Sequence, residues 1–391
     1  MAVTAQDKIL CNGCGVCALV CPKYCITMKS DDAGFLYPYT NKKKCTQCGL
    51  CFRKCPLAAA DAVSASPFPV CYAAYALDDM IRQQSSSGGV FSLFAARILA
   101  LEGSIYGAAF DETLTVKHIR VTDTPGLERL RKTKYVQSDL GNCYRDVKKD
   151  LKQGRWVFFT GTPCQIGGLY SFLSEKPEKL LTADTICMGV PSPRIYRQYL
   201  SEMEALYKSP VASIDFRAKV PNWQEYKVHI SFANGEERLC ARTKDDYMLA
   251  FSHKYTLRPS CYRCKFKSLY HQADITLGDF WGIKTVCPEM FDARGTSMLL
   301  LHSEKGMKFF QNISPNLRIK KVDAGSIEAC NPYLVESASR PPDQNAFLQC
   351  VSEYGLHRAI MRFTQPPVLK RTYNKIRHSI HRFFKKNSGA T

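Results

Sequence analysis

The chain has 391 residues, of which 45% are hydrophobic and 23% charged, and its formal net charge is +19. This composition is ordinary for a globular protein with a sizeable core, and the length predicts two or three domains. The first residues lack the apolar core of a signal peptide, and no apolar run approaches the roughly 18 residues of a membrane span. We therefore expect a cytoplasmic protein.

The 19 cysteines are the most informative part of the composition. In a long chain without a signal peptide, clustered cysteines indicate metal or redox chemistry rather than disulfides. Thiolates bound to metal carry negative charge that the formal count omits. The positive excess therefore does not by itself predict a nucleic-acid partner, and we expect none.

Two segments near the start repeat one cysteine pattern. CNGCGVCALVCP and CTQCGLCFRKCP both read C-x2-C-x2-C-x3-C-P. Three cysteines at this spacing wrap one iron–sulfur cube, while the fourth reaches the other cube and the proline turns the chain away. The pattern predicts two 4Fe-4S clusters. Their ligands are Cys11, Cys14, Cys17 and Cys55 for the first, and Cys45, Cys48, Cys51 and Cys21 for the second.

A pair of zinc sites is the alternative interpretation of these cysteines. Structural zinc usually takes two separated pairs of ligands, which the repeated triplets fit poorly. The segment resembles bacterial two-cluster ferredoxins over its whole length. We assign residues 1–60 to a ferredoxin-like domain and 61–70 to a linker. Cys25 and Cys71 fall outside the pattern and are interpreted as packing residues.

From about residue 71 to residue 330, short apolar strands alternate with helices, which predicts a mixed α/β domain. A helix is expected from about Gly89 and a hairpin around Asn234-Gly235. The predicted strands are VCYAAYA, SIYGAAF, VKHIRVT, WVFFTG, LLTADTIC, SIDFRA and ADITLGDFWG. The standard dinucleotide fingerprint and the nucleoside-triphosphate loop are both absent from the sequence.

Two predicted helix starts have anion-binding character. QQSSSGGV places Ser86, Ser87, Gly88 and Gly89 at a helix N-terminus, where hydroxyls and backbone N–H groups suit a phosphate or serve as ordinary caps. In TGTPCQ, Thr162 suits the N-cap and Pro163 the first helical position. Cys164 would then lie in the first turn, where the helix dipole favours a thiolate.

Three further cysteines lie near strand ends or in loops. Cys187 ends a predicted strand, and Cys261 and Cys264 form a C-x2-C pair before the strand that ends at Gly278-Asp279. A lone C-x2-C also fits half a zinc site or a redox dithiol. Together with Cys164, these residues would suit a third cube.

The motifs SSSGGVFS, KTKYVQSD, TGTPCQIGGL, ICMGVPS and CYRCKFK…ADITLGDFWG occur in this order. As an ordered set they resemble the beta-subunit family of the coenzyme F(420) hydrogenases and dehydrogenases, from about residue 70 to residue 330. The resemblance implies FAD beside a 4Fe-4S cluster held by Cys164, Cys187, Cys261 and Cys264. The chain departs from the hydrogenase subunit in its acidic G-D-F-W ending, which casts doubt on coenzyme F(420) as the substrate.

The resemblance also implies the flavin site. It consists of Ser86, Ser87, Gly88, Gly89, Lys134, Tyr135, Gln137, Thr160, Gly161 and Thr162. Lys134 would hold a phosphate or stabilise charge on the reduced ring, and Asp279 would orient ring or ribose groups. A solvated lysine and an ordinary turn cap are the structural alternatives. Both residues are our candidates for catalysis.

These features predict an oxidoreductase that relays single electrons through clusters to FAD, for two-electron reduction or oxidation of a small molecule. The expected donor is reduced ferredoxin or a reduced nicotinamide or deazaflavin, and the resemblance extends to bacterial members linked to surface polysaccharide synthesis. The alternatives are an electron-transfer subunit of a larger redox complex and a zinc-bearing binding protein.

Residues 331–391 read as helices with a basic end. After Glu353 there is no acidic residue, and VLKRTYNKIRHSIHRFFKK mixes apolar residues with cations. This segment would suit peripheral contact with an acidic inner-membrane surface, a solvated helix or a partner-binding arm.

Overall fold

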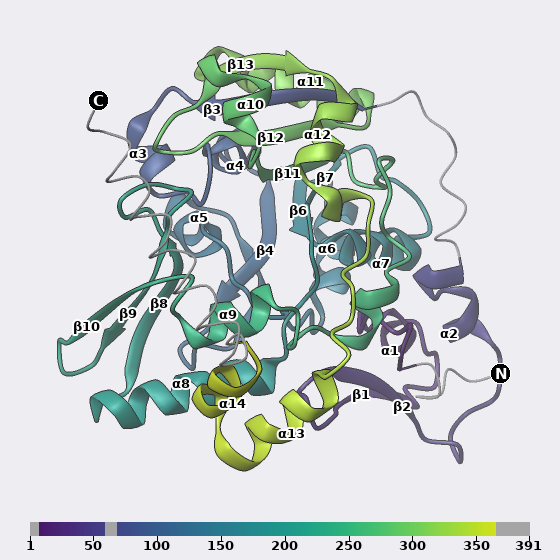
Figure 1. The fold of residues 1–391 in the computed structure, drawn as a ribbon. Coiled ribbons are helices and arrows are strands. Elements are labelled where there is room, and N and C mark those ends of the chain that lie inside the picture. Colours follow the sequence, from purple (N-terminus) through teal and green to yellow (C-terminus); the bar gives the residue numbers. More distant parts are fainter. Residues whose placement is uncertain (1–7, 59–68, 365–391) are drawn as a thin grey trace, which may run out of the picture.

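The computed structural model describes residues 8–58 and 69–364. The first range contains a small two-stranded unit. Its elements are α1 (Val16–Leu19), β1 (Ile26–Ser30), β2 (Leu36–Thr40) and α2 (Leu50–Arg53). Strands β1 and β2 pair antiparallel, and each short helix contains the third cysteine of one triplet. This unit lies at one side of the molecule, beside α7 (Figure 1).

An eight-stranded mixed sheet forms the centre of the larger part. Its strands, in spatial order, are β13 (Leu317–Val322), β3 (Val70–Ala76), β12 (Ser297–Leu301), β11 (Ile275–Asp279), β7 (Leu180–Thr185), β6 (Val157–Gly161), β4 (Ser104–Phe110) and β5 (Val116–Val121). Strands β11, β7, β6 and β4 run parallel, and the remaining pairs are antiparallel. The predicted mixed α/β architecture is therefore confirmed.

Helices cover both faces of this sheet. One face carries α4 (Val90–Leu99), α5 (Thr124–Leu130) and α11 (Glu304–Ile313), and the other carries α6 (Cys143–Lys152), α7 (Pro163–Leu173), α10 (Ile283–Val286) and α12 (Ala324–Cys330). Helix α3 (Asp79–Gln83) follows β3. Coverage on both faces explains why β12 is buried at all five positions, the pattern of a central strand.

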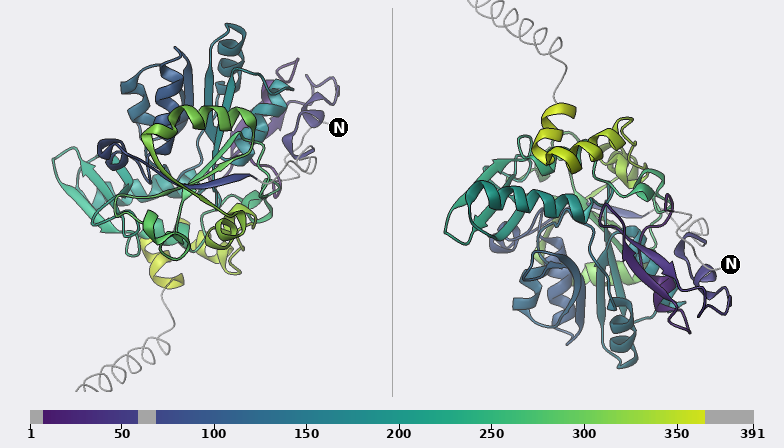
Figure 2. Two further views of the ribbon diagram at one scale, coloured as in Figure 1. Left: turned by 90° about the horizontal axis from the view of Figure 1, so that it is seen from above. Right: turned by 90° about the horizontal axis from the view of Figure 1, so that it is seen from below.

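A three-stranded antiparallel sheet lies at the side opposite the cysteine-rich unit, as both views of Figure 2 show. It contains β8 (Val211–Ala218), β9 (Lys227–Phe232) and β10 (Glu237–Ala241). The last two strands form the predicted hairpin, and Gly235 takes a left-handed conformation with φ 86° in its turn.

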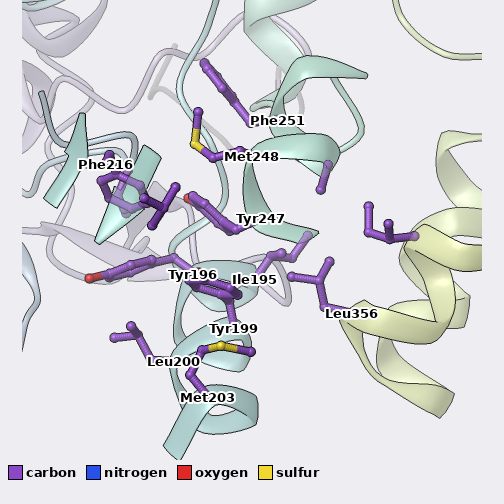
Figure 3. Packing of buried hydrophobic residues seen from close by; sticks show 14 of the residues in the cluster. Ile195, Tyr196, Tyr199, Leu200, Met203, Phe216, Tyr247, Met248, Phe251 and Leu356 are labelled. Atoms are coloured by element: carbon purple, nitrogen blue, oxygen red, sulfur yellow. The ribbon is translucent and has the colours of Figure 1, made fainter. Parts of the chain in front are cut away.

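A second core joins this small sheet to the C-terminal helices. Tyr196 and Tyr199 on α8 (Pro193–Tyr207) pack with Tyr247 on α9 (Asp246–Ser252), and Leu356 approaches from α14 (Leu356–Phe363) (Figure 3). Helix α13 (Gln344–Tyr354) belongs to the same core. In the described part of the predicted extension 331–391, helices α13 and α14 are thus integral to the larger part. The basic stretch from residue 365 and most of the predicted linker, residues 61–68, lie outside the described residues.

In the part of the chain that the structure describes, no helix combines the length and the apolar character that crossing a membrane requires.

Candidate functional site

The two cysteine triplets have matching backbone geometry. Gly13 and Gly15 in the first loop have positive φ, as do Gln47 and Gly49 at the equivalent places in the second. Left-handed residues at these points bend the backbone into a tight loop. Both triplets therefore curl in the way that wrapping a cube requires.

The structure brings together the four cysteines predicted for the first cluster. Burial raises the pKa of Cys17 to about 12, and the neighbouring Cys11 and Cys55 thiols raise it further. Burial also raises the pKa of Cys14, with contributions from Cys17, Cys11 and Cys55. Cys55 thus joins the first loop although it follows the second triplet in sequence.

The second set is more open. Cys48 is exposed, and Cys51 packs with Cys21 and Cys45. Cys25 is buried, as expected for a packing residue, but its Sγ lies 3.3 Å from that of Cys21. The sequence pattern missed this contact because Cys25 stands outside the repeat.

Cys164, Cys187, Cys261 and Cys264 line one small cavity, together with Leu10, Asn12 and Leu57 from the cysteine-rich unit. Thr162 and Pro163 begin α7 as predicted, with Thr162 and Gln165 forming a capping box. The thiol of Cys164 lies 3.2 Å from the Thr162 hydroxyl. Four cysteines from three segments of the larger part therefore meet where that part contacts the first loop.

Burial acts against the thiolate that we expected at Cys164. The helix dipole was expected to favour its thiolate, but burial raises the pKa of Cys164, and neighbouring Cys264 and Cys187 raise it further. Burial likewise raises the pKa of Cys187 to about 11. Desolvation disfavours the charged form of the thiols in this cavity. Such a set becomes ionised only when a cation joins it, which fits a cluster of iron ions.

Among the described residues, no group of three or more His, Cys, Asp or Glu side chains is arranged to hold a single metal ion. A cube differs from a single ion because it spreads four thiolates over separate corners.

A cleft of about 670 Å³ lies at the carboxyl ends of β6, β7 and β11. Ligands in open α/β sheets bind at this edge, and the volume is typical of cofactor sites. The predicted flavin or catalytic residues that line it are Ser86, Ser87, Gly89, Lys134, Tyr135, Thr160, Gly161, Thr162 and Asp279. Cys187 lines both this cleft and the cysteine cavity, so the two sites share a wall.

Two predicted flavin residues do not line the cleft. Gly88 is buried, and its N–H donates to the Ser297 hydroxyl at 2.9 Å. The Gln137 side chain faces the first cysteine loop, where its Nε2 donates to the Asn12 carbonyl at 2.9 Å. Gln137 therefore connects the segment that carries Lys134 to the first loop.

Arg217 on β8 is a residue of the cleft that sequence reasoning missed. Its side chain is 3% exposed, pairs with the Asp279 carboxylate and donates to the Tyr135 hydroxyl at 3.3 Å. Burial alone would lower the pKa of Arg217, but Asp279 holds it above its ordinary value. The buried Nε of Arg217 has no partner among the described residues, which leaves a donor for a polar ligand.

Lys134 also lines the cleft. Its Nζ donates to the carbonyls of Arg129 and Arg131 at 2.8 and 2.6 Å. Burial lowers the pKa of Lys134 to about 7, and Lys132 adds to this while Asp215 opposes it. The cleft thus combines cationic side chains, hydroxyls and apolar walls, which fits a flavin with its phosphates and ring.

Residues 154–325 match the family model for the C-terminal region of the coenzyme F(420) hydrogenase/dehydrogenase beta chain. Residues 10–59 match the model of a 4Fe-4S dicluster domain. The two matched regions do not overlap, and the 4Fe-4S match precedes the beta-subunit match along the chain. The matches confirm the resemblance and establish an iron–sulfur protein of oxidoreductase type. The first match includes the four cavity cysteines and Asp279, whereas Ser86 and Lys134 precede it.

Two individual proteins are also similar. A stretch of 65 residues is 35% identical to NADH-quinone oxidoreductase subunit I of Pelobacter propionicus, and spans 14% of this chain and 34% of that protein. This chain therefore matches about a third of that relative's length. A chain of the F(420)-reducing nickel–iron hydrogenase complex from Methanosarcina barkeri, from a xenon derivatization study, is 16% identical, with a TM-score of 0.49. That similarity covers 73% of this chain and 93% of the other.

Proposed function

We propose that the chain is a flavin- and iron–sulfur-dependent oxidoreductase with three 4Fe-4S clusters and one FAD. The observation that carries this proposal is the shared wall at Cys187, because it puts the cysteine cavity directly beside the cleft. Clusters exchange single electrons, and a flavin exchanges either one or two. The pairing suits conversion of one-electron delivery into two-electron chemistry on a small molecule.

The positions of the cysteine sets support an ordered route. The second loop, with exposed Cys48, is open to an external partner. The first loop lies next to the larger part, since a Cβ on Gly168 of α7 would be 3.0 Å from the Cys14 Cβ. The cavity cysteines come next, and Cys187 borders the cleft. The proposed route therefore runs from the second loop to the first loop, then to the cavity cysteines and finally to the cleft, and each site neighbours the next.

Within the cleft, the proposed role of Ser86, Ser87 and Lys134 is to bind the phosphates of the flavin. Arg217 and Asp279 would orient the ring or ribose, with the free Arg217 Nε as a donor. Lys134 would also act on negative charge at the reduced ring, because its pKa near 7 allows it to hold or release a proton.

The exposed second loop also supports the proposed donor. Lys42, Lys43 and Lys44 are exposed directly before Cys45. Positive charge beside an electron-entry site favours an acidic carrier such as reduced ferredoxin over a neutral one. The same surface would serve an electron-transfer subunit of a larger complex, whereas the cleft favours a substrate site within this chain. Reduction of a sugar precursor remains a prediction of the resemblance.

The test is metal and flavin content after anaerobic purification. We expect about twelve irons and one FAD per chain, falling to about eight irons in a Cys261→Ser/Cys264→Ser variant. The matched control is Cys240→Ser, a cysteine on β10 outside all three sets, which should keep about twelve. About eight irons in all three proteins would contradict a third cluster, and colourless protein containing zinc would support the binding-protein alternative.

A further inference from the structure

Arg258 is a buried cation between the cysteine-rich unit and the larger part. Its side chain has no exposed surface. None of the ion pairs formed among residues 8–58 and 69–364 includes it. An isolated buried charge is costly, and proteins normally place an opposite charge close to it. The partner of this guanidinium therefore has to be something other than a described carboxylate.

The contacts of Arg258 point to the first cysteine loop. Its Nε donates to the Cys11 carbonyl at 2.7 Å, and one Nη lies 3.9 Å from the Cys11 Sγ. The same Nη donates to the Leu36 carbonyl at 2.9 Å. The guanidinium carbon is 4.2 Å from the centroid of the Tyr37 ring. One side chain from the larger part thus fixes both the first loop and β2.

The surroundings of Arg258 also connect it to the cavity cysteines. Arg258 and Asn12 line the cavity of Cys164, Cys187, Cys261 and Cys264. The buried Asn12 Nδ2 has no partner among the described residues, so a second N–H donor is available beside this cavity. A positive charge and N–H groups are therefore located between the cavity cysteines and the first cysteine loop.

We propose that Arg258 is a positioning residue that supplies the counter-charge for the cluster on Cys11, Cys14, Cys17 and Cys55 and raises its reduction potential. An oxidised cube with four thiolates carries about −2, and adding one electron makes it more negative. A fixed cation beside a ligand sulfur stabilises the reduced form more than the oxidised form. Net charge and hydrogen bonds to the sulfurs are established determinants of cluster potential.

This inference rests on the proposed cluster, so the experiment separates the two. Iron content of each holoprotein reports on the cluster, and a reductive titration followed by electron paramagnetic resonance reports on the role of Arg258. In Arg258→Met we expect one titration step to move to lower potential by at least a tenfold change in the one-electron equilibrium, or 59 mV. Arg258→Lys, which keeps the charge, should shift less.

The control is Arg194→Met. Arg194 is exposed and also donates to the cysteine-rich unit, at the Asp32 carbonyl, but it contacts none of the twelve predicted ligands. Its removal should leave every step unchanged. A full iron content with unchanged potentials in Arg258→Met would overturn the inference.

If Arg258→Met loses iron, a second variant tests the role of Arg258. Gln137 Oε1 accepts from an Arg258 Nη at 2.9 Å. Gln137→Glu places a carboxylate there with little change in volume and neutralises the guanidinium. It should lower the same potential, and an unchanged value would refute the role assigned to Arg258.

Discussion

The two cysteine loops share one sequence pattern and one backbone geometry, but their surroundings differ. The first loop is enclosed by Arg258, Gln137 and α7, whereas the second exposes Cys48 and is preceded by three exposed lysines. Two loops with the same cysteine pattern can therefore have different functions. The enclosed loop is suited to passing electrons within the protein, and the open loop is suited to receiving them.

Gly13 and Gln47 give the strongest test of this difference, because they occupy equivalent positions. A Cβ on Gly13 would lie 2.7 Å from an Arg258 Nη, whereas Gln47 already carries a side chain that is exposed. Gly13→Gln should lower the free energy of unfolding by about 3 kcal/mol through backbone strain and overpacking. Gln47→Gly should change it by less than about 1 kcal/mol.

Denaturant unfolding of the anaerobic proteins measures both values. Equal losses in the two variants would mean that the loops are enclosed to the same extent, and the comparison between them would fail.

The exposed lysines of the second loop provide the next test. Lys42→Glu/Lys43→Glu/Lys44→Glu should reduce the rate constant for reduction by an acidic carrier about tenfold at low salt, and the difference should shrink as salt rises. The matched control, Arg318→Glu/Lys320→Glu/Lys321→Glu, reverses three exposed charges on β13. Stopped-flow reduction measures both. An equal loss in the control would indicate a general charge effect rather than docking at the second loop.

The smallest expected effect is the pH dependence of flavin binding in the cleft. The pKa of Lys134 is lowered from 10.5 to about 7, so its positive charge decreases as pH rises through 7. Flavin affinity should therefore fall severalfold between about pH 6 and pH 8, and stay nearly constant in Lys134→Arg. Fluorescence titration with FAD measures this, and a parallel pH dependence in both proteins would exclude Lys134 as the cause.

The effect of Lys134 on folding has the opposite direction. The unfolded chain holds this proton more tightly than the folded chain, so Lys134 reduces stability below about pH 7. This contribution is relieved as pH rises from about 7 towards 10.5.

Local patterns predicted much of this fold. The strands β3 to β11 that were expected from apolar runs are present, and Thr162 caps α7 as its sequence indicates. The buried strand β12 was missed, although SMLLL is an apolar run, because short runs of this kind do not distinguish strand from helix. The edge strand β13 was missed because its charged residues give little hydrophobic pattern.

The site was less predictable than the fold for a physical reason. Cysteine spacing predicts candidate ligands because a cube would restrict the chain locally, whereas Arg217 and Arg258 act through contacts with residues far away in sequence. The contacts of Gln137 were also not predictable from its local motif. Its motif predicted a flavin contact, and its side chain instead meets Asn12 and Arg258.

The enclosure of the first loop also has a consequence for biogenesis. Cys14 packs against α7, and its loop is covered by residues that are synthesised more than a hundred positions later. If the proposed cluster binds here, iron has to reach Cys11, Cys14 and Cys17 before these segments close over them. The second loop remains accessible in the finished protein. A cluster damaged by oxygen could be rebuilt there without unfolding, whereas one lost from the first loop would require the two parts to separate.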